Sequence, residues 1–116
     1  MFLAKVEGAV VATKKDPAMV GRKMLILRPQ LVDDKDPSRL RPGTNTIVAV
    51  DTVGAGIGEM VLFCQGSSAR LAQNLKNAPV DAVVIGIVDT VDVLGKEIFN
   101  AKTSSPPRNF FARFQK

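Results

Sequence analysis

Short apolar runs separated by turn residues dominate this chain. Each run is rich in Val, Ile, Leu or Phe and is bounded by Gly, Pro, Asp or Asn, the pattern typical of β-strands. Strands are therefore predicted within five segments: Phe2 to Ala12, Met24 to Leu27, Ile47 to Val50, Met60 to Cys64, and Ala82 to Val88. A shorter pair, Thr90 to Leu94 and Glu97 to Phe99, flanks Gly95 and Lys96 and indicates a hairpin.

Two glycines inside these runs predict bends. Gly8 and Gly86 stand where a strand would otherwise continue, and glycine there often marks a bulge or a sharp corner. One short helix is predicted from Ser67 or Ser68, either of which would cap it, and Asn77 and Pro79 would end it. The predicted fold is thus mainly β: a small closed barrel of about five strands with one short helix, formed by residues 1–100.

Several predicted strands are apolar on both faces. Met24 to Leu27, Met60 to Cys64 and Ala82 to Ile85 contain no charged residue, and side chains alternate across a strand. A single barrel would expose part of this surface, and contiguous apolar patches usually mark an interface. We therefore expect a homo-oligomer with closed cyclic symmetry. The alternative is a crowded aliphatic core with only scattered apolar residues outside.

Composition narrows the function. The 116 residues include no histidine and one cysteine, so a Ser-His-Asp triad, an internal disulfide and a thiolate metal cage are excluded, and we expect neither metal nor cofactor. No apolar run reaches the ~18 residues that span a bilayer, and the N-terminus lacks the pattern of a secretory signal, which favours a cytoplasmic location. The net charge is +5, of which residues 101–116 supply +4 and residues 1–100 only +1.

A glycine-rich stretch, Asp51 to Glu59, is the most conspicuous candidate for chemistry. Its spacing is G-x-G-x-G, with Glu59 where a dinucleotide fingerprint needs its last glycine, and a strand rather than a helix follows. Glycines also permit close backbone approach. We therefore predict that this loop lines the narrow opening on the symmetry axis of a ring, through Gly54, Ala55, Gly56, Ile57 and Gly58. Exposed amides there would favour small anions.

Further polar residues are candidates for contacts between subunits. Arg70 follows the serine cap of the predicted helix, and arginine suits bidentate pairing with a carboxylate. The simpler interpretation is that the serines only cap the helix. The complete set of interface candidates is Asp51, Glu59, Ser67, Ser68, Arg70 and Asp81.

The basic tail, residues 101–116, is predicted to act separately. Phe110, Phe111 and Phe114 fit one side of a short amphipathic helix that also carries basic residues. The tail would dock on a neighbouring subunit or on another protein of the same assembly, or pack on its own barrel.

The ordered set of segments resembles the bacterial microcompartment vertex proteins, the family that includes the carboxysome and ethanolamine-utilisation vertex subunits. The matching segments are Val6 to Lys14, Gly21 to Leu25, Val50 to Glu59 with Val61 and Leu62, Gly66 to Arg70, and Val80 to Asp89. The resemblance implies an OB-like barrel, a pentameric ring at the vertices of a polyhedral shell, hexameric shell proteins as partners, and no catalytic residues. The tail beyond Asn100 is not part of that pattern.

Two other functions compete with this interpretation. An OB barrel can bind single-stranded nucleic acid by stacking bases on aromatic side chains in a basic groove. Here Phe63 is the only aromatic residue inside a predicted strand rather than at its end, and the excess positive charge lies in the tail. A nucleotide-dependent enzyme would use the glycine loop, which lacks the required context. We therefore expect a structural protein with no enzymatic activity that binds neither nucleic acid nor membrane.

Overall fold

Eight β-strands and two short 3-10 helices form the structure, a computed structural model that describes residues 1–13, 16–71 and 80–103, without the side chains of Ser67, Ser68 and Arg70. In chain order the elements are β1 (Phe2–Val10), η1 (Pro17–Met19), β2 (Lys23–Val32), β3 (Leu40–Pro42), β4 (Ile47–Asp51), β5 (Met60–Gln65), η2 (Gly66–Leu71), β6 (Ala82–Ile87), β7 (Thr90–Val93) and β8 (Lys96–Asn100). All five predicted strands and the predicted hairpin are confirmed. Within the described ranges, no helix has the length and apolar character to cross a membrane.

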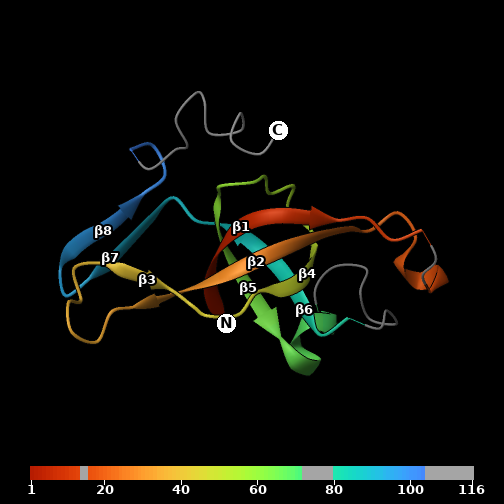
Figure 1. The fold of residues 1–116 in the computed structure, drawn as a ribbon, viewed down its shortest axis with the longest axis horizontal. Coiled ribbons are helices and arrows are strands. Elements are labelled where there is room, and N and C mark those ends of the chain that lie inside the picture. Colours follow the sequence, from red (N-terminus) through yellow and green to blue (C-terminus); the bar gives the residue numbers. More distant parts are fainter. Residues whose placement is uncertain (14–15, 72–79, 104–116) are drawn as a thin grey trace.

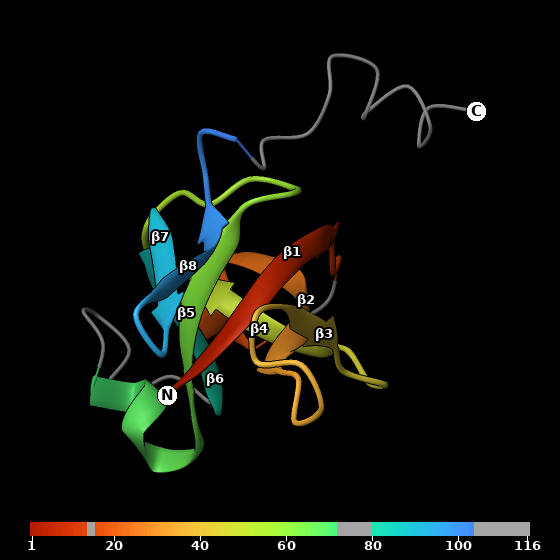
Figure 2. The same cartoon turned by 90° about the vertical axis from the view of Figure 1, so that its left-hand side faces the viewer.

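Five strands close into an OB-like barrel. They follow the order β1-β5-β6-β4-β2, and pairing of β1 with β2 closes the circle (Figures 1 and 2). All neighbours are antiparallel except β4 and β6, which run parallel through Val50–Val83 and Asp51–Val84. Closure pairs both edges of each of these five strands, so association through the barrel itself must use its outer side-chain surface or its loops.

The predicted bends lie at places where the strand register slips. Pairing of β1 with β2 shifts between Val6 and Gly8, and pairing of β5 with β6 shifts between Leu62 and Phe63, opposite the Gly86 region. Bulges increase the local twist and bend the strand. Gly8 and Gly86 thus help short strands to curve around a narrow core, as the sequence predicted.

The core consists of small and medium side chains on the inner face of each strand. Leu25, Leu27, Val61 and Phe63 are at most 1% exposed, and alanines fill the spaces between them. A second cluster lies outside the barrel, where Val50, Val80, Val83 and Ala69 are buried together with η1 and η2 against the outer face of β4 and β6. Among the residues that the structure describes, these segments cover only part of the outer apolar surface.

One strand and part of another were not predicted. β3 is absent from the sequence-based prediction, and β2 continues to Val32 instead of ending at Leu27. The reason is long-range pairing, in which Gln30 lies opposite Pro42 and the Pro29 carbonyl accepts a hydrogen bond of 2.8 Å from the Gly43 amide. The predicted helix begins as η2, and residues 72–79, which include its predicted end, lie outside the described part of the chain.

The polar loop between β2 and β3 is organised around Asp33. Its carboxylate accepts hydrogen bonds from the Lys35 and Asp36 amides and from Arg39 Nε at 3.0 Å, although the residue is only 7% exposed. The hydrogen bond from the Lys35 amide, and next the one from the Arg39 side chain, hold the pKa of Asp33 below its usual range. The charged form of this carboxyl group is therefore the one that the fold favours.

We expect Asp33→Asn to lower the thermal midpoint at neutral pH and to matter less in acid. Because the pKa of Asp33 is lower in the folded protein, its stabilising effect is present above the unfolded pKa of about 4 and is lost as pH falls through the folded pKa. Thermal unfolding of the wild type and the variant at pH 7 and pH 3 measures the difference between their thermal midpoints at each pH. Asp34→Asn, at the exposed neighbour, is the control. An equal gap at both pH values would contradict this assignment.

Candidate functional site: the glycine loop and the interface residues

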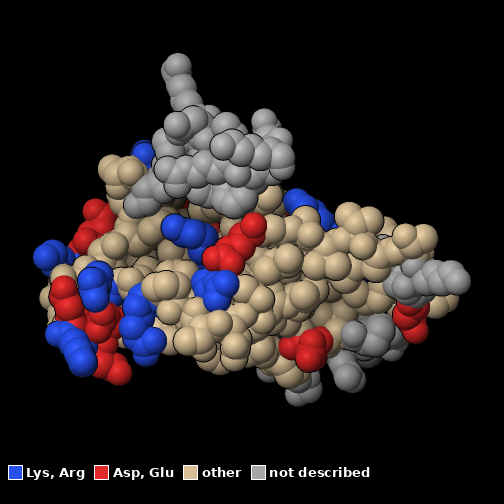
Figure 3. Space-filling model, in the orientation of Figure 1, with Lys and Arg blue, Asp and Glu red and all other residues tan. Residues whose placement is uncertain are grey.

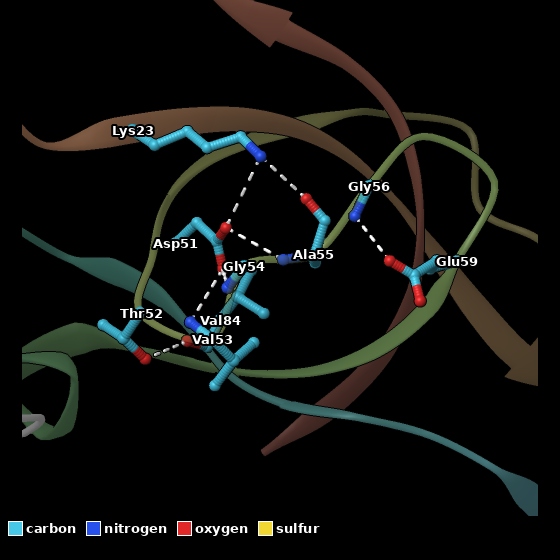
Figure 4. Close-up of polar contacts among 9 residues, drawn as sticks. All are labelled: Lys23, Asp51, Thr52, Val53, Gly54, Ala55, Gly56, Glu59 and Val84. Atoms are coloured by element: carbon cyan, nitrogen blue, oxygen red, sulfur yellow. Dashed lines mark hydrogen bonds and ion pairs between the residues drawn. The ribbon is translucent and has the colours of Figure 1, made fainter.

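The loop between β4 and β5 is held by two carboxylates of its own. Asp51 Oδ1 accepts hydrogen bonds from the amides of Val53 at 3.0 Å and Gly54 at 3.2 Å, and Oδ2 accepts one from Ala55 at 3.0 Å (Figure 4). Glu59 Oε1 accepts another from the Gly56 amide at 2.6 Å. Four successive amides of the loop therefore already have partners.

Lys23 at the start of β2 completes this arrangement. Its Nζ donates a hydrogen bond of 2.9 Å to the Ala55 carbonyl and lies 3.8 Å from Asp51 Oδ2. The Asp51 side chain is only 2% exposed, whereas that of Lys23 is 54% exposed. A nearly buried carboxylate is thus compensated by three amides and by one ammonium group that still faces solvent. The sequence analysis missed Lys23, because it lies far from Asp51 in the chain and only strand pairing brings them together.

The loop is also tied to the barrel on both sides. The Gly58 amide donates to the Val6 carbonyl at 2.8 Å, and the Val6 amide donates to the Glu59 carbonyl at 3.0 Å. Thr52 Oγ1 donates to the Val84 carbonyl at 2.7 Å. Gly54 and Gly58 have φ values of +79° and +90°, which other residues rarely adopt, so glycine is required at both positions. The loop is consequently a rigid turn.

This geometry argues against a nucleotide-binding loop. A phosphate cradle needs free amides, and here the amides of residues 53–56 and 58 are all bonded within the chain. The same fact removes the reason to expect anions at exposed amides. Phe63 is the aromatic residue on which a nucleic-acid base would have to stack. It is 1% exposed and packs instead against Phe2, with ring centroids 5.4 Å apart.

The five predicted axis residues do not share one environment. Ala55 is fully buried in the barrel core, whereas Ile57 is half-buried and packs against the same core. Gly54 is exposed, and so is Val53, a residue that the sequence analysis did not single out. That the loop lines an axial opening stays a prediction, and Val53 and Gly54 are its exposed residues before Ala55.

The interface candidates fall into two groups. Asp51 and Glu59 stabilise the loop, whereas Asp81 directly precedes β6, and its carbonyl accepts a hydrogen bond of 2.7 Å from the Gly66 amide. The Asp81 residue is exposed. The side chains of Ser67, Ser68 and Arg70, and the tail residues Phe110, Phe111 and Phe114, lie outside the described part of the structure, so their predicted contacts stay predictions.

Comparison with known proteins gives a consistent result. The model of the family described as "Ethanolamine utilisation protein EutN/carboxysome" matches residues 1–89. A bacterial microcompartment shell vertex protein of Salmonella typhimurium, PduN, is 47% identical over 91 residues, which cover 78% of this chain and 98% of the relative. The carboxysome shell vertex protein CcmL of Gloeobacter violaceus is 45% identical over 88% of this chain and 96% of its own length.

Solved structures agree with this result. The structure of Gloeobacter violaceus CcmL superposes with a TM-score of 0.76 and covers 88% of this chain and 99% of that one. The pentameric microcompartment shell protein GrpN of Rhodospirillum rubrum is 44% identical with a TM-score of 0.66, over 81% of this chain and 99% of that one. The closed barrel, the glycine loop and these matches together show that the chain belongs to the EutN/CcmL family of microcompartment proteins.

Proposed function

We propose that five copies of this chain form a closed ring that caps a vertex of a polyhedral bacterial microcompartment shell. Flat hexagonal tiles cannot close a surface without fivefold corners, and a pentamer supplies such a corner. The ring would contact hexameric shell proteins around its rim. Its role is structural. This agrees with a glycine loop whose amides donate hydrogen bonds to carboxylates of the same chain.

The observation that carries this proposal is the apolar outer face of a barrel that is already closed. Val48 on β4 is 50% exposed and Ile87 on β6 is 40% exposed. Ile26 on β2 and Leu62 on β5 alternate with buried neighbours and are half-buried. Burying a few hundred Å² of such surface contributes several kcal/mol per subunit, at about 25 cal/mol per Å². A second copy of the chain can supply that burial.

The distribution of charge supports the same conclusion. Lys, Arg, Asp and Glu gather at the end that holds the β2–β3 and β7–β8 hairpins, while much of the remaining face is uncharged (Figure 3). Depletion of charge is characteristic of the central part of protein interfaces. A ring joins two different patches of each subunit head to tail, so apolar surface on more than one side of the barrel is what it requires.

A rigid loop suits the narrow axis of such a ring. Copies of one loop must approach closely there. The backbone of this loop is fixed by hydrogen bonds, and residues 52–55 are all small, with no side chain larger than valine. Fixed geometry keeps the opening constant from one subunit to the next.

Native mass spectrometry tests the ring directly. At micromolar subunit concentration we expect a dominant species of five chains, because the exposed aliphatic residues favour closed association. A single species at the mass of one chain would contradict the proposal.

Asp51→Asn tests the rigidity of the loop. An asparagine side chain keeps one acceptor and replaces the other oxygen with a donor, so the Ala55 amide loses its partner. We expect a loss of about 1–3 kcal/mol in the free energy of unfolding, measured by denaturant titration. Asp89→Asn, at an exposed residue, should change it little. Equal effects of the two substitutions would show that the loop does not depend on this carboxylate.

Gly56→Trp tests the position of the loop at the axis. Gly56 has room for a Cβ, whose nearest contact would be Glu59 Oε1 at 3.4 Å, so Gly56→Ala should assemble normally. The indole of Gly56→Trp should instead crowd five copies at the axis and prevent ring closure or obstruct the opening. Native mass spectrometry and electron microscopy measure both results. A normal ring with an unchanged opening would place the loop away from the axis.

A further inference from the structure

The β7–β8 hairpin projects from the barrel and pairs only with itself among the described strands. It leaves the barrel after β6 and is closed at its base by a hydrogen bond of 2.8 Å from the Ala101 amide to the Asp89 carbonyl (Figures 1 and 2). An isolated two-stranded hairpin is marginally stable in water. The hairpin also lies beyond residues 1–89, which match the family model. Strand pairing with the described barrel therefore does not stabilise this hairpin.

The tip of this hairpin carries an unfavourable residue. Leu94 has φ +53° and Gly95 has φ +78°, so both turn residues are left-handed, a conformation for which Asn, Asp or Gly is strongly preferred at the first position. Leu94 is also 88% exposed. A branched apolar side chain in this position costs stability twice, through backbone strain and through contact with water. Its contact with water is removed if the side chain enters an apolar pocket, and that burial offsets the strain.

The structure contains such a pocket at a distance from the hairpin. An open groove of about 230 Å³ is lined by Met19, Met24, Val48, Ala49, Val50, Val80, Asp81 and Ala82. The η1 segment, which supplies Met19, lies at the opposite end of the long axis from the hairpin (Figure 1). Leu94 therefore cannot fill the groove of its own chain, whereas the groove of a second copy can receive it.

Charge at the two sites is complementary. Lys96 lies two residues after Leu94, and Asp81 lines the groove. Both residues are exposed, and neither side chain has an ion-pair partner within the part of the chain that the structure describes. Insertion of the tip into the groove of another copy would bring a cation to an unpaired carboxylate.

We propose that Leu94 of each subunit inserts into the Met19–Val48–Val80 groove of the next subunit, and that Lys96 pairs with Asp81 across the same interface. The inference rests on the ring proposed above and names the two different surfaces that it joins. The groove is complete only when a second copy contributes Leu94. Repetition of this contact around the ring gives each hairpin the covering surface that it lacks.

Disulfide trapping tests the contact. In a Cys64→Ser background, Leu94→Cys combined with Val48→Cys should form covalent ladders that end at the ring under mild oxidation, because a disulfide requires Cα atoms within about 7 Å. Each single variant, and the pair Leu71→Cys with Val48→Cys, should give no ladder, although Leu71 is also 88% exposed. Denaturing gels of the oxidised proteins show the result.

Leu94→Asn separates this role from simple folding. Asparagine suits the turn, so the hairpin should not be weakened, whereas the ring should reach half dissociation at a concentration at least about tenfold higher by analytical ultracentrifugation. Lys96→Glu and Asp81→Lys should each weaken the ring, and the combined variant should recover much of the loss. Lys102→Glu, near the base of the hairpin, is the matched charge control.

Three results would overturn the inference. In the first, the wild type forms rings, but Leu94→Cys combined with Val48→Cys gives no ladder and Leu94→Asn does not change ring dissociation. This result would refute the contact and leave the proposed function intact. In the second, the thiol introduced by Val48→Cys reacts with a thiol reagent only after residues 104–116 are removed. This result would show that the tail, and not Leu94, occupies the groove. Wild-type chains that stay single would refute both the ring and the contact.

Discussion

The apolar outer face of a closed barrel is the constraint on which the rest of this structure depends. Closing five strands around alanines, valines, two leucines and one phenylalanine pairs the edges of the barrel strands, but it turns the other face of each strand outward. η1 and η2 cover part of that face, where Val50, Val80 and Val83 are buried. Val48 and Ile87 stay exposed. The described elements do not cover them, so association with other subunits completes what the fold leaves open.

The glycine loop solves a different problem. Tight turns expose consecutive amides, and unsatisfied buried amides are costly. Here Asp51 and Glu59 accept those hydrogen bonds, and Lys23 balances the nearly buried charge of Asp51. The result is a turn that binds its own carboxylates instead of a ligand. A glycine-rich loop beside a strand is thus compatible with a purely structural role when carboxylates of the same loop saturate its amides.

Two separate surfaces of the molecule have complementary properties. A projecting hairpin carries Leu94 at its tip, and the barrel carries an open apolar groove with Asp81 on its wall. Ring symmetry requires two different surfaces of this kind, because each subunit meets its neighbours with opposite sides. In the proposed ring, the Leu94 side chain of one subunit and the groove of the next subunit form the two sides of one contact.

The sequence by itself determined the strands, the bends at Gly8 and Gly86, the two-faced apolar character and the family, because alternation, glycine and motif order are local signals. Tertiary structure decided what depends on distant pairing. β3 exists only because Gln30 meets Pro42, and Lys23 reaches Asp51 only because β2 lies beside β4. Ala55 lies in the core, since the path of the loop is set by hydrogen bonds to β1. Local patterns cannot report such contacts, since residues far apart in the chain create them.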